Sequence, residues 1–190
     1  MKTLASFFLR GKPWQIFVVV AGLYAVGMSA IVDPMLPFPT PHAVVTRATM
    51  LSGLVAAVST LGLLVWLWSM GSFFNSIVVT NLKMREGLFR TALVYPPVYI
   101  AWYISTFPIS GIRKFLVDFL LALPGMFCVV YLFVFVSKTL VMTETGEPAT
   151  FSDYAGPFFL LWFFPVGIWI IQPRVNRLYA NRRLQGQTLA

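Results

Sequence analysis

Five stretches of this sequence contain no charged residue, and each is about as long as a bilayer is thick. They cover residues 13–32, 48–82, 91–112, 119–137 and 154–173. About 20 helical residues cross a hydrocarbon core of roughly 30 Å. Only 11% of the residues are charged and 58% are hydrophobic, whereas a soluble domain carries about a quarter of its residues as charges. The sequence therefore predicts a single all-α integral membrane domain over residues 1–190.

The basic residues indicate which stretches cross the membrane. Four spans at about 14–32, 48–70, 115–137 and 155–172, with the N-terminus inside, leave two basic residues outside, Arg47 and Lys138. The other 12 then lie inside: Lys2, Arg10, Lys12, Lys83, Arg85, Arg90, Arg113, Lys114, Arg174, Arg177, Arg182 and Arg183. A fifth span at 91–112 would divide the charges seven to seven. Because basic loops stay in the cytoplasm, we expect four spans with both termini inside.

The segment 71–114 is then cytoplasmic, although it is too apolar to leave the membrane. Pro96 and Pro97 disfavour a plain helix, so we expect an interfacial or re-entrant segment on the inner leaflet. Its helix would carry an i,i+4 pair between Glu86 and Arg90. Seven basic residues are predicted to anchor anionic headgroups on this side: Lys83, Arg85, Arg90, Arg113, Lys114, Arg174 and Arg177.

Small residues recur every four positions in the first two predicted spans. They are Ala21, Ala25, Ser29, Ser52, Ala56 and Thr60, and such stripes allow helices to approach closely in lipid. Helix breakers interrupt the other two spans: Pro124 and Gly125 in the third, Pro165 and Gly167 in the fourth. These kinks could line a small cavity, but ordinary kinks between packed helices are the favoured interpretation.

No constellation of catalytic residues appears in the sequence. The chain has one histidine, His42, and one cysteine, Cys128, so neither a two-histidine metal site nor an internal disulfide is expected. Asp118 is the one acid within the predicted spans, and we expect it to pair with Lys114 in the first turn of its helix. The sequence therefore predicts no catalytic residue, no cofactor and no metal site.

The last third of the chain carries a distinctive string. It begins with FSDY at residues 151–154 and continues with FFLLWFFPVGIWIIQPRVN at 158–176. This string resembles an uncharacterised family of small bacterial multi-pass membrane proteins, in which an acid often stands at the place of Pro157. The resemblance implies the bacterial inner membrane and no particular activity. Before it, residues 145–147 are predicted to turn, and Ser152 is predicted to cap the last helix.

The favoured function is that of a non-enzymatic accessory or assembly subunit of a membrane complex. The alternative is a small oligomeric transporter or channel that uses the kinked third and fourth spans, and a lipid-modifying enzyme is the least supported. A polar cavity among the helices would favour the transporter. The expected partners are the bilayer, anionic headgroups of its inner leaflet, and another membrane protein or a second copy of the chain, with no nucleic acid.

Overall fold

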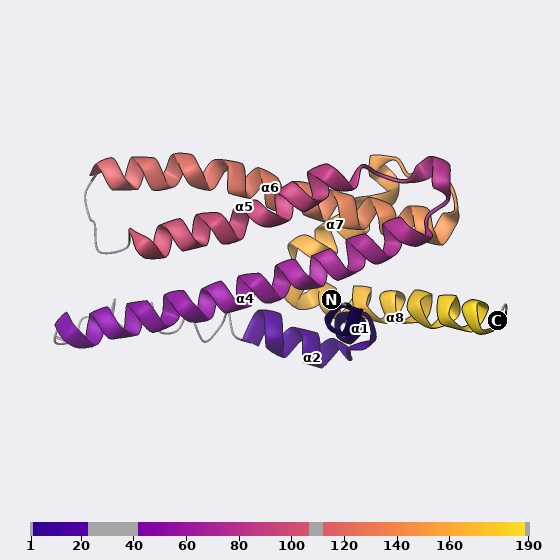
Figure 1. Ribbon diagram of the computed structural model, residues 1–190, viewed down its shortest axis with the longest axis horizontal. Coiled ribbons are helices and arrows are strands. Elements are labelled where there is room, and N and C mark those ends of the chain that lie inside the picture. The colour runs from indigo at the N-terminus through magenta and orange to yellow at the C-terminus, as the bar shows by residue number, and fades with distance from the viewer. Residues whose placement is uncertain (1, 23–41, 107–111, 189–190) are drawn as a thin grey trace.

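The chain is mainly helical in the part that the structure describes. The computed structural model describes residues 2–22, 42–106 and 112–188 (Figure 1), and these ranges contain no strand. Within these ranges, two helical segments are long and apolar enough to cross a membrane, Ala57–Ile77 and Ile112–Thr145. The predicted all-α class is therefore confirmed for the described residues.

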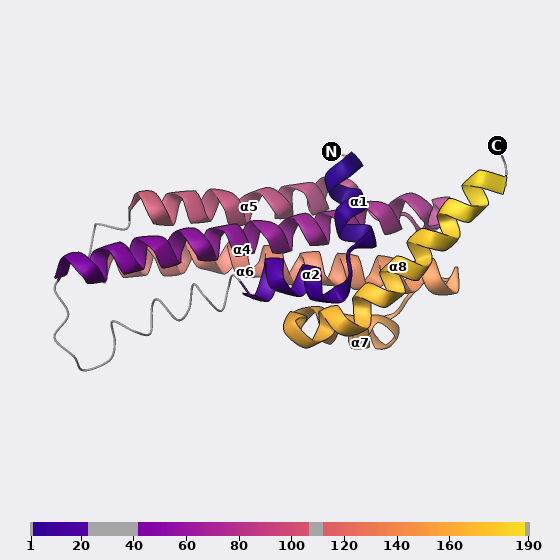
Figure 2. The same cartoon turned by 90° about the horizontal axis from the view of Figure 1, so that it is seen from below.

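Three long helices lie side by side and form the body of the molecule (Figures 1 and 2). They are α4 (His42–Ile77, 36 residues), α5 (Glu86–Ser105, 20 residues) and α6 (Ile112–Thr145, 34 residues). Successive helices run in opposite directions. We call the end at which α5 turns into α6 the hairpin end. The opposite end, where residues 78–85 join α4 to α5, is the connector end.

Helix α5 continues through both of its prolines. It includes Pro96 and Pro97 as interior residues, so the prediction that they prevent a plain helix is wrong. Each proline lacks an N–H and leaves one carbonyl a turn earlier without its usual donor. Packing against α4 and α6 holds the helix together in spite of this loss, as neighbouring helices do for prolines in membrane proteins. At about 30 Å, α5 is as long as a hydrocarbon core is thick.

Helix α4 extends beyond the predicted end at Met70. Its last turns bury Met70 and Phe74, and this burial favours continuation of the helix. Gly71 permits close contact with α5, because a Cβ atom there would lie 2.4 Å from Cζ of Phe89. The Phe89 ring in turn stacks on Phe135 of α6, with 4.2 Å between the ring centroids. One glycine and two aromatic rings thus hold the three long helices together.

The predicted fourth span is two helices, not one. Helix α7 (Phe151–Trp162) ends at Phe163, and α8 (Phe164–Thr188) turns back along it (Figure 1). Gly167 is required at this turn, because a Cβ atom there would lie 1.7 Å from the carbonyl oxygen of Leu160. The breakers at 165–167 therefore mark a helical hairpin, and the prediction of one continuous helix over 155–172 is wrong.

The cap of α7 also differs from the prediction. Thr150, not Ser152, is the N-cap residue, and it forms a capping box with Asp153. The Thr150 amide and hydroxyl both donate to Oδ2 of Asp153, at 2.7 Å each. These bonds hold the pKa of the Asp153 carboxyl below its ordinary value. Just before this cap, Gly146 takes a positive φ of 74°, and the predicted turn at 145–147 is confirmed.

The N-terminal region forms short helices that cross the body of the molecule. Helix α1 (Lys2–Arg10) packs on α4 and α8, and α2 (Pro13–Phe17) leads into a π-helix, η1 (Val18–Gly22). The rest of the predicted first span, residues 23–32, lies outside the described residues. η1 packs against α4 at Gly62, where a Cβ atom would lie 3.2 Å from Cγ1 of Val19.

Candidate functional site

A buried amide joins three separate parts of the chain. Gln172 of α8 is fully buried, as is Trp66 of α4, and the Trp66 indole N–H donates to Oε1 of Gln172 at 3.0 Å. The Gln172 amide nitrogen donates to the carbonyls of Phe8 at 2.8 Å and Gly11 at 3.2 Å, and lies 3.0 Å from Oδ1 of Asn176. Buried polar groups are costly unless paired. We call Trp66, Gln172, Asn176 and the Phe8 and Gly11 carbonyls the amide clasp.

A second amide fastens the connector end. The Asn75 side chain of α4 accepts from the Met84 N–H at 2.9 Å. It donates to the Met84 carbonyl and to Oε1 of Glu86, at 3.2 Å each. The predicted pair of Glu86 with Arg90 is confirmed at 2.7 Å.

An ion pair joins α8 to the end of α6. Arg174 Nε donates to Oε1 of Glu144 at 3.0 Å, and Arg174 Nη2 pairs with Oε2 of the same carboxylate. Both side chains are partly buried. The four-span prediction places Glu144 outside and Arg174 inside the cell. A direct contact between the two side chains rules out a membrane between them, so that separation is wrong. The physical reason is the α7–α8 turn, which brings Arg174 back to the connector end.

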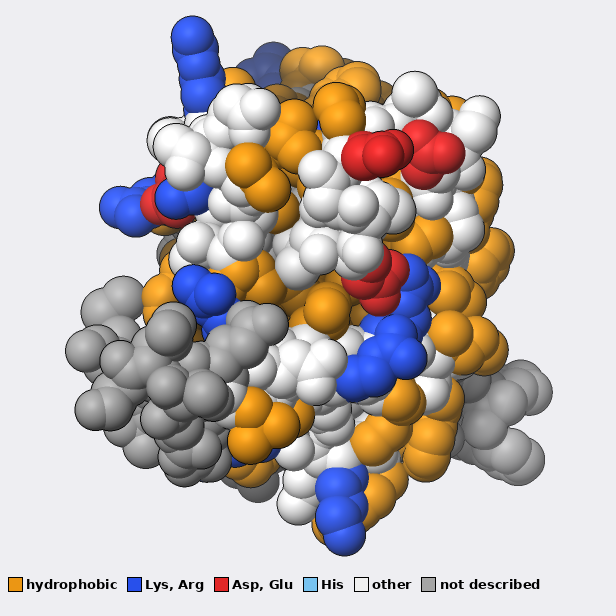
Figure 3. All heavy atoms as spheres, turned by 90° about the vertical axis from the view of Figure 1, so that its right-hand side faces the viewer, with side chains coloured by type: hydrophobic (Ala, Val, Ile, Leu, Met, Phe, Trp, Pro, Cys, Tyr) orange, Lys and Arg blue, Asp and Glu red, His pale blue; other side chains and the backbone are white. Residues whose placement is uncertain are grey.

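Basic and acidic side chains both lie on the face at the connector end (Figure 3). Lys83, Arg85 and Arg90 are exposed around the α4–α5 connection, and Arg177 is exposed on α8. Of the seven predicted anchoring residues, Arg113 and Lys114 lie apart from the others, at the start of α6 in the hairpin end. The structure thus brings together five of the predicted anchoring residues and separates these two.

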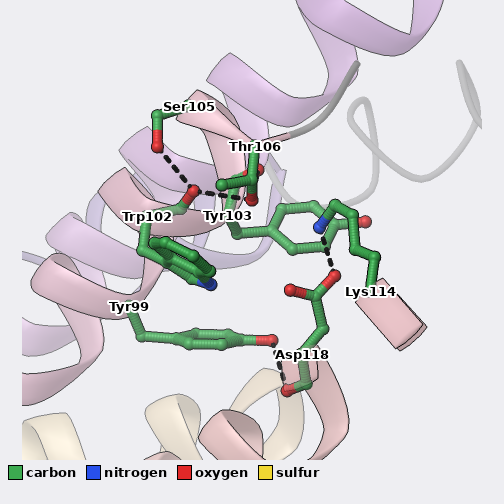
Figure 4. A network of polar contacts seen from close by, with 7 residues as sticks. All are labelled: Tyr99, Trp102, Tyr103, Ser105, Thr106, Lys114 and Asp118. Carbon is green, nitrogen blue, oxygen red and sulfur yellow. Dashed lines mark hydrogen bonds and ion pairs between the residues drawn. The ribbon is translucent and has the colours of Figure 1, made fainter. Parts of the chain in front are cut away.

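The hairpin end carries its own polar cluster (Figure 4). Lys114 forms the predicted ion pair with Asp118, and its Nζ lies 5.0 Å from the centroid of the Tyr103 ring. The Tyr99 hydroxyl points at the Asp118 carbonyl from 3.4 Å. The Trp102 carbonyl accepts from the hydroxyls of Ser105 and Thr106. The contacts of Lys114 with Tyr103 and of Tyr99 with Asp118 fasten α5 to α6. The prediction that Asp118 pairs with Lys114 is confirmed, although the pair ends in the second turn of α6 and not the first.

Two shallow grooves open on the sides of the long helices. One, of about 370 Å³, runs between α5 and α6 past Leu88, Tyr95, Phe127 and Tyr131. The other, of about 220 Å³, lies between α4 and α5 beside Leu61, Trp68 and Pro97. Both have predominantly apolar walls.

The predicted kink residues of α6 lie near the larger groove. Pro124 is an interior residue of α6, and a Cβ atom on Gly125 would lie 3.4 Å from Cε1 of Tyr95. The Tyr95 hydroxyl donates to the Leu121 carbonyl at 2.7 Å. The predicted side-by-side kinks in the third and fourth spans are not found, because Pro165 and Gly167 belong to the α7–α8 turn.

The predicted small-residue stripe falls mostly outside the described residues. Ala25 and Ser29 lie there, as do the side chains of Ala21, Ser52 and Ala56. Thr60 is half-buried on α4. The close approach that is described here involves Gly62 and Val19 instead, and the stripe stays a prediction.

Comparison of the chain with protein-family models, with curated proteins and with solved structures finds no match. The arguments for function therefore rest on the residues. Sequence reasoning missed the amide clasp because it took Gln172 as the exit of a span. The signal was present: Gln172 is a lone amide at the end of a long apolar run, and such a side chain needs a polar partner wherever it is buried.

Proposed function

We propose that the chain crosses a bacterial cytoplasmic membrane four times with both termini inside, through residues 14–32, α4, α5 and α6. The α7–α8 hairpin enters the inner leaflet and returns. Trp162 lies beside the turn of this hairpin, and its ring centroid is 6.2 Å from that of Phe133, well inside α6. Arg174 pairs with Glu144 at the connector end. Large apolar side chains are exposed around this turn, as lipid contact requires: Phe159, Trp162, Phe163, Val166 and Trp169.

The charge distribution supports this topology. Only Arg47, Arg113 and Lys114 lie outside, which leaves 11 basic residues inside: Lys2, Arg10, Lys12, Lys83, Arg85, Arg90, Lys138, Arg174, Arg177, Arg182 and Arg183. The even division of basic residues predicted for a span at 91–112 assumed that residues 155–172 also cross the membrane. When α5 crosses and α7–α8 re-enters, the positive-inside rule is satisfied.

Cysteine labelling in a Cys128→Ser background tests the topology. A membrane-impermeant thiol reagent added to intact cells should modify Arg113→Cys and not Gly146→Cys. Pro39→Cys, outside in either topology, is the positive control, and Lys83→Cys, inside in either, is the negative control. Labelling of Gly146→Cys with protection of Arg113→Cys would restore the single crossing at 155–172.

Within this topology the chain acts as a non-enzymatic accessory or assembly subunit of a membrane complex. The positions of the polar and apolar side chains support this function. The buried amides Gln172 and Asn75 are used within the chain, in contacts that fasten its helices. The grooves open sideways, where a neighbouring helix or lipid lies, and their walls are mostly apolar. A transporter needs polar groups that converge on a path for its substrate.

Site-specific photo-crosslinking in cells tests this function. A photoreactive phenylalanine analogue at Leu61, in the α4–α5 groove, should give one discrete adduct with another membrane protein. The same analogue at Val98, exposed on α5 outside the groove lining, should not. Absence of an adduct at Leu61, or equal adducts at both positions, would contradict the subunit role. Solute flux into liposomes that contain only the purified chain would support the transporter instead.

A further inference from the structure

The larger groove, between α5 and α6, ends near an isolated positive charge. Lys138 follows an uncharged run of 19 residues, 119–137, in α6. It lies seven residues after Tyr131 and eleven after Phe127, which both line the groove, so all three share one face of α6. Phe135, which stacks on Phe89 near the start of α5, lies one turn before Lys138. The lysine therefore sits just beyond the groove, toward the connector end.

The Lys138 ammonium has no partner within the part of the chain that the structure describes. It makes no hydrogen bond, ion pair or ring contact there, and its side chain is half-buried. A lysine at this depth snorkels to the headgroup level of the bilayer.

Two hydroxyl groups among the groove residues, those of Thr91 and Tyr95, are already used in hydrogen bonds to backbone carbonyls. Thr91 donates to the carbonyls of its own helix at Leu88 and Gly87, and Tyr95 donates to Leu121. The walls between Leu88 and Phe127 therefore present mainly carbon. Tyr131, at the end of the groove nearer Lys138, makes no hydrogen bond among the described residues and keeps its hydroxyl free for an acceptor.

We propose that this groove and Lys138 form a binding site for one anionic phospholipid of the inner leaflet. An acyl chain lies in the groove, the ester region is near Tyr131, and the phosphate pairs with Lys138. The charge argues for a lipid as the occupant, because phosphate is the anion that a bilayer supplies at this depth. The site goes beyond the accessory role and does not require it. It uses only the proposed topology, which the cysteine labelling tests separately.

Native mass spectrometry of the purified full chain tests the site. The chain is titrated with phosphatidylglycerol or with phosphatidylcholine of the same acyl chains. We expect one retained phosphatidylglycerol in preference to phosphatidylcholine. Lys138→Gln should lower its retention about fivefold, the effect of one lysine near an anionic lipid. Arg113→Gln, which removes an exposed charge at the hairpin end, is the matched control and should leave retention unchanged.

A second pair of variants tests the groove itself. Thr91→Trp fills the groove and should lower retention of both lipids, whereas Ala101→Trp, on an exposed part of α5 outside the groove lining, should not. Size-exclusion profiles show whether each variant stays folded. Unchanged phosphatidylglycerol retention in Lys138→Gln, or an equal loss in Arg113→Gln, would overturn the site. Equal retention by Thr91→Trp and the unmodified chain would overturn the placement of the acyl chain.

Discussion

The amide clasp predicts that the chain loses stability when Gln172 is replaced by an apolar residue. In Gln172→Leu, a side chain of similar length loses both its donor and its acceptor. The indole N–H of Trp66 and the carbonyl of Phe8 then stay buried without the partner that Gln172 provides. Each buried polar group left unpaired costs about 1–3 kcal/mol. The extra apolar surface of leucine offsets part of this cost, so we expect a net loss of about 2–3 kcal/mol.

Thermal unfolding in detergent, followed by size-exclusion fluorescence, measures this loss. For a chain of this size about 1 kcal/mol lowers Tm by about 2–4 °C, so Gln172→Leu should melt about 4–12 °C below the unmodified chain. Asn181→Leu changes an exposed amide on the same helix and is the control, with Tm within a degree or two.

A double-mutant cycle isolates the bond itself. Trp66→Phe removes the indole donor, and the pair Trp66→Phe with Gln172→Leu should lose less stability than the sum of the single variants. The coupling should be about 0.6–1.7 kcal/mol, the range for hydrogen bonds between membrane helices. A Tm of Gln172→Leu equal to that of the control, or strictly additive losses, would refute the reasoning.

Three further predictions concern other contacts, each measured as Tm in detergent. Gly71→Val should lower the free energy of unfolding by about 1–3 kcal/mol, because a Cβ atom at this position would lie 2.4 Å from the Phe89 ring. Gly87→Ala, which has open space around it, should leave Tm unchanged. Equal Tm values for the two variants would show that the α4–α5 contact is loose. Asp118→Asn should lose about 1–3 kcal/mol, because it leaves the largely buried ammonium of Lys114 beside a neutral amide; a loss below about 1 kcal/mol would show that water replaces the carboxylate. Glu86→Gln should lose at most about 1 kcal/mol, because its ion pair with Arg90 is exposed and glutamine keeps an acceptor for Asn75; a larger loss would show that the carboxylate is needed at the connector end.

Local pairs were predictable because they depend only on helical spacing. Glu86 with Arg90 and Lys114 with Asp118 are four residues apart, and any helix through them brings the side chains together. The α5 helix was not predictable in the same way. Pro96 and Pro97 argue against a helix locally, and only the packing of α5 between its neighbours outweighs that cost.

The all-α class follows from the sequence alone, because long uncharged stretches must satisfy the hydrogen bonds of their backbone within a helix. The sequence also contains the uneven distribution of basic residues on which the proposed topology rests. Which stretches turn back, by contrast, depends on how the helices pack. Residues 155–172 are long enough to cross, and neither their length nor their hydropathy distinguishes a span from a hairpin. That distinction comes from a backbone contact of Gly167 with Leu160 and from the pairing of Arg174 with Glu144, thirty positions apart. Contacts of this kind exist only after the helices have packed.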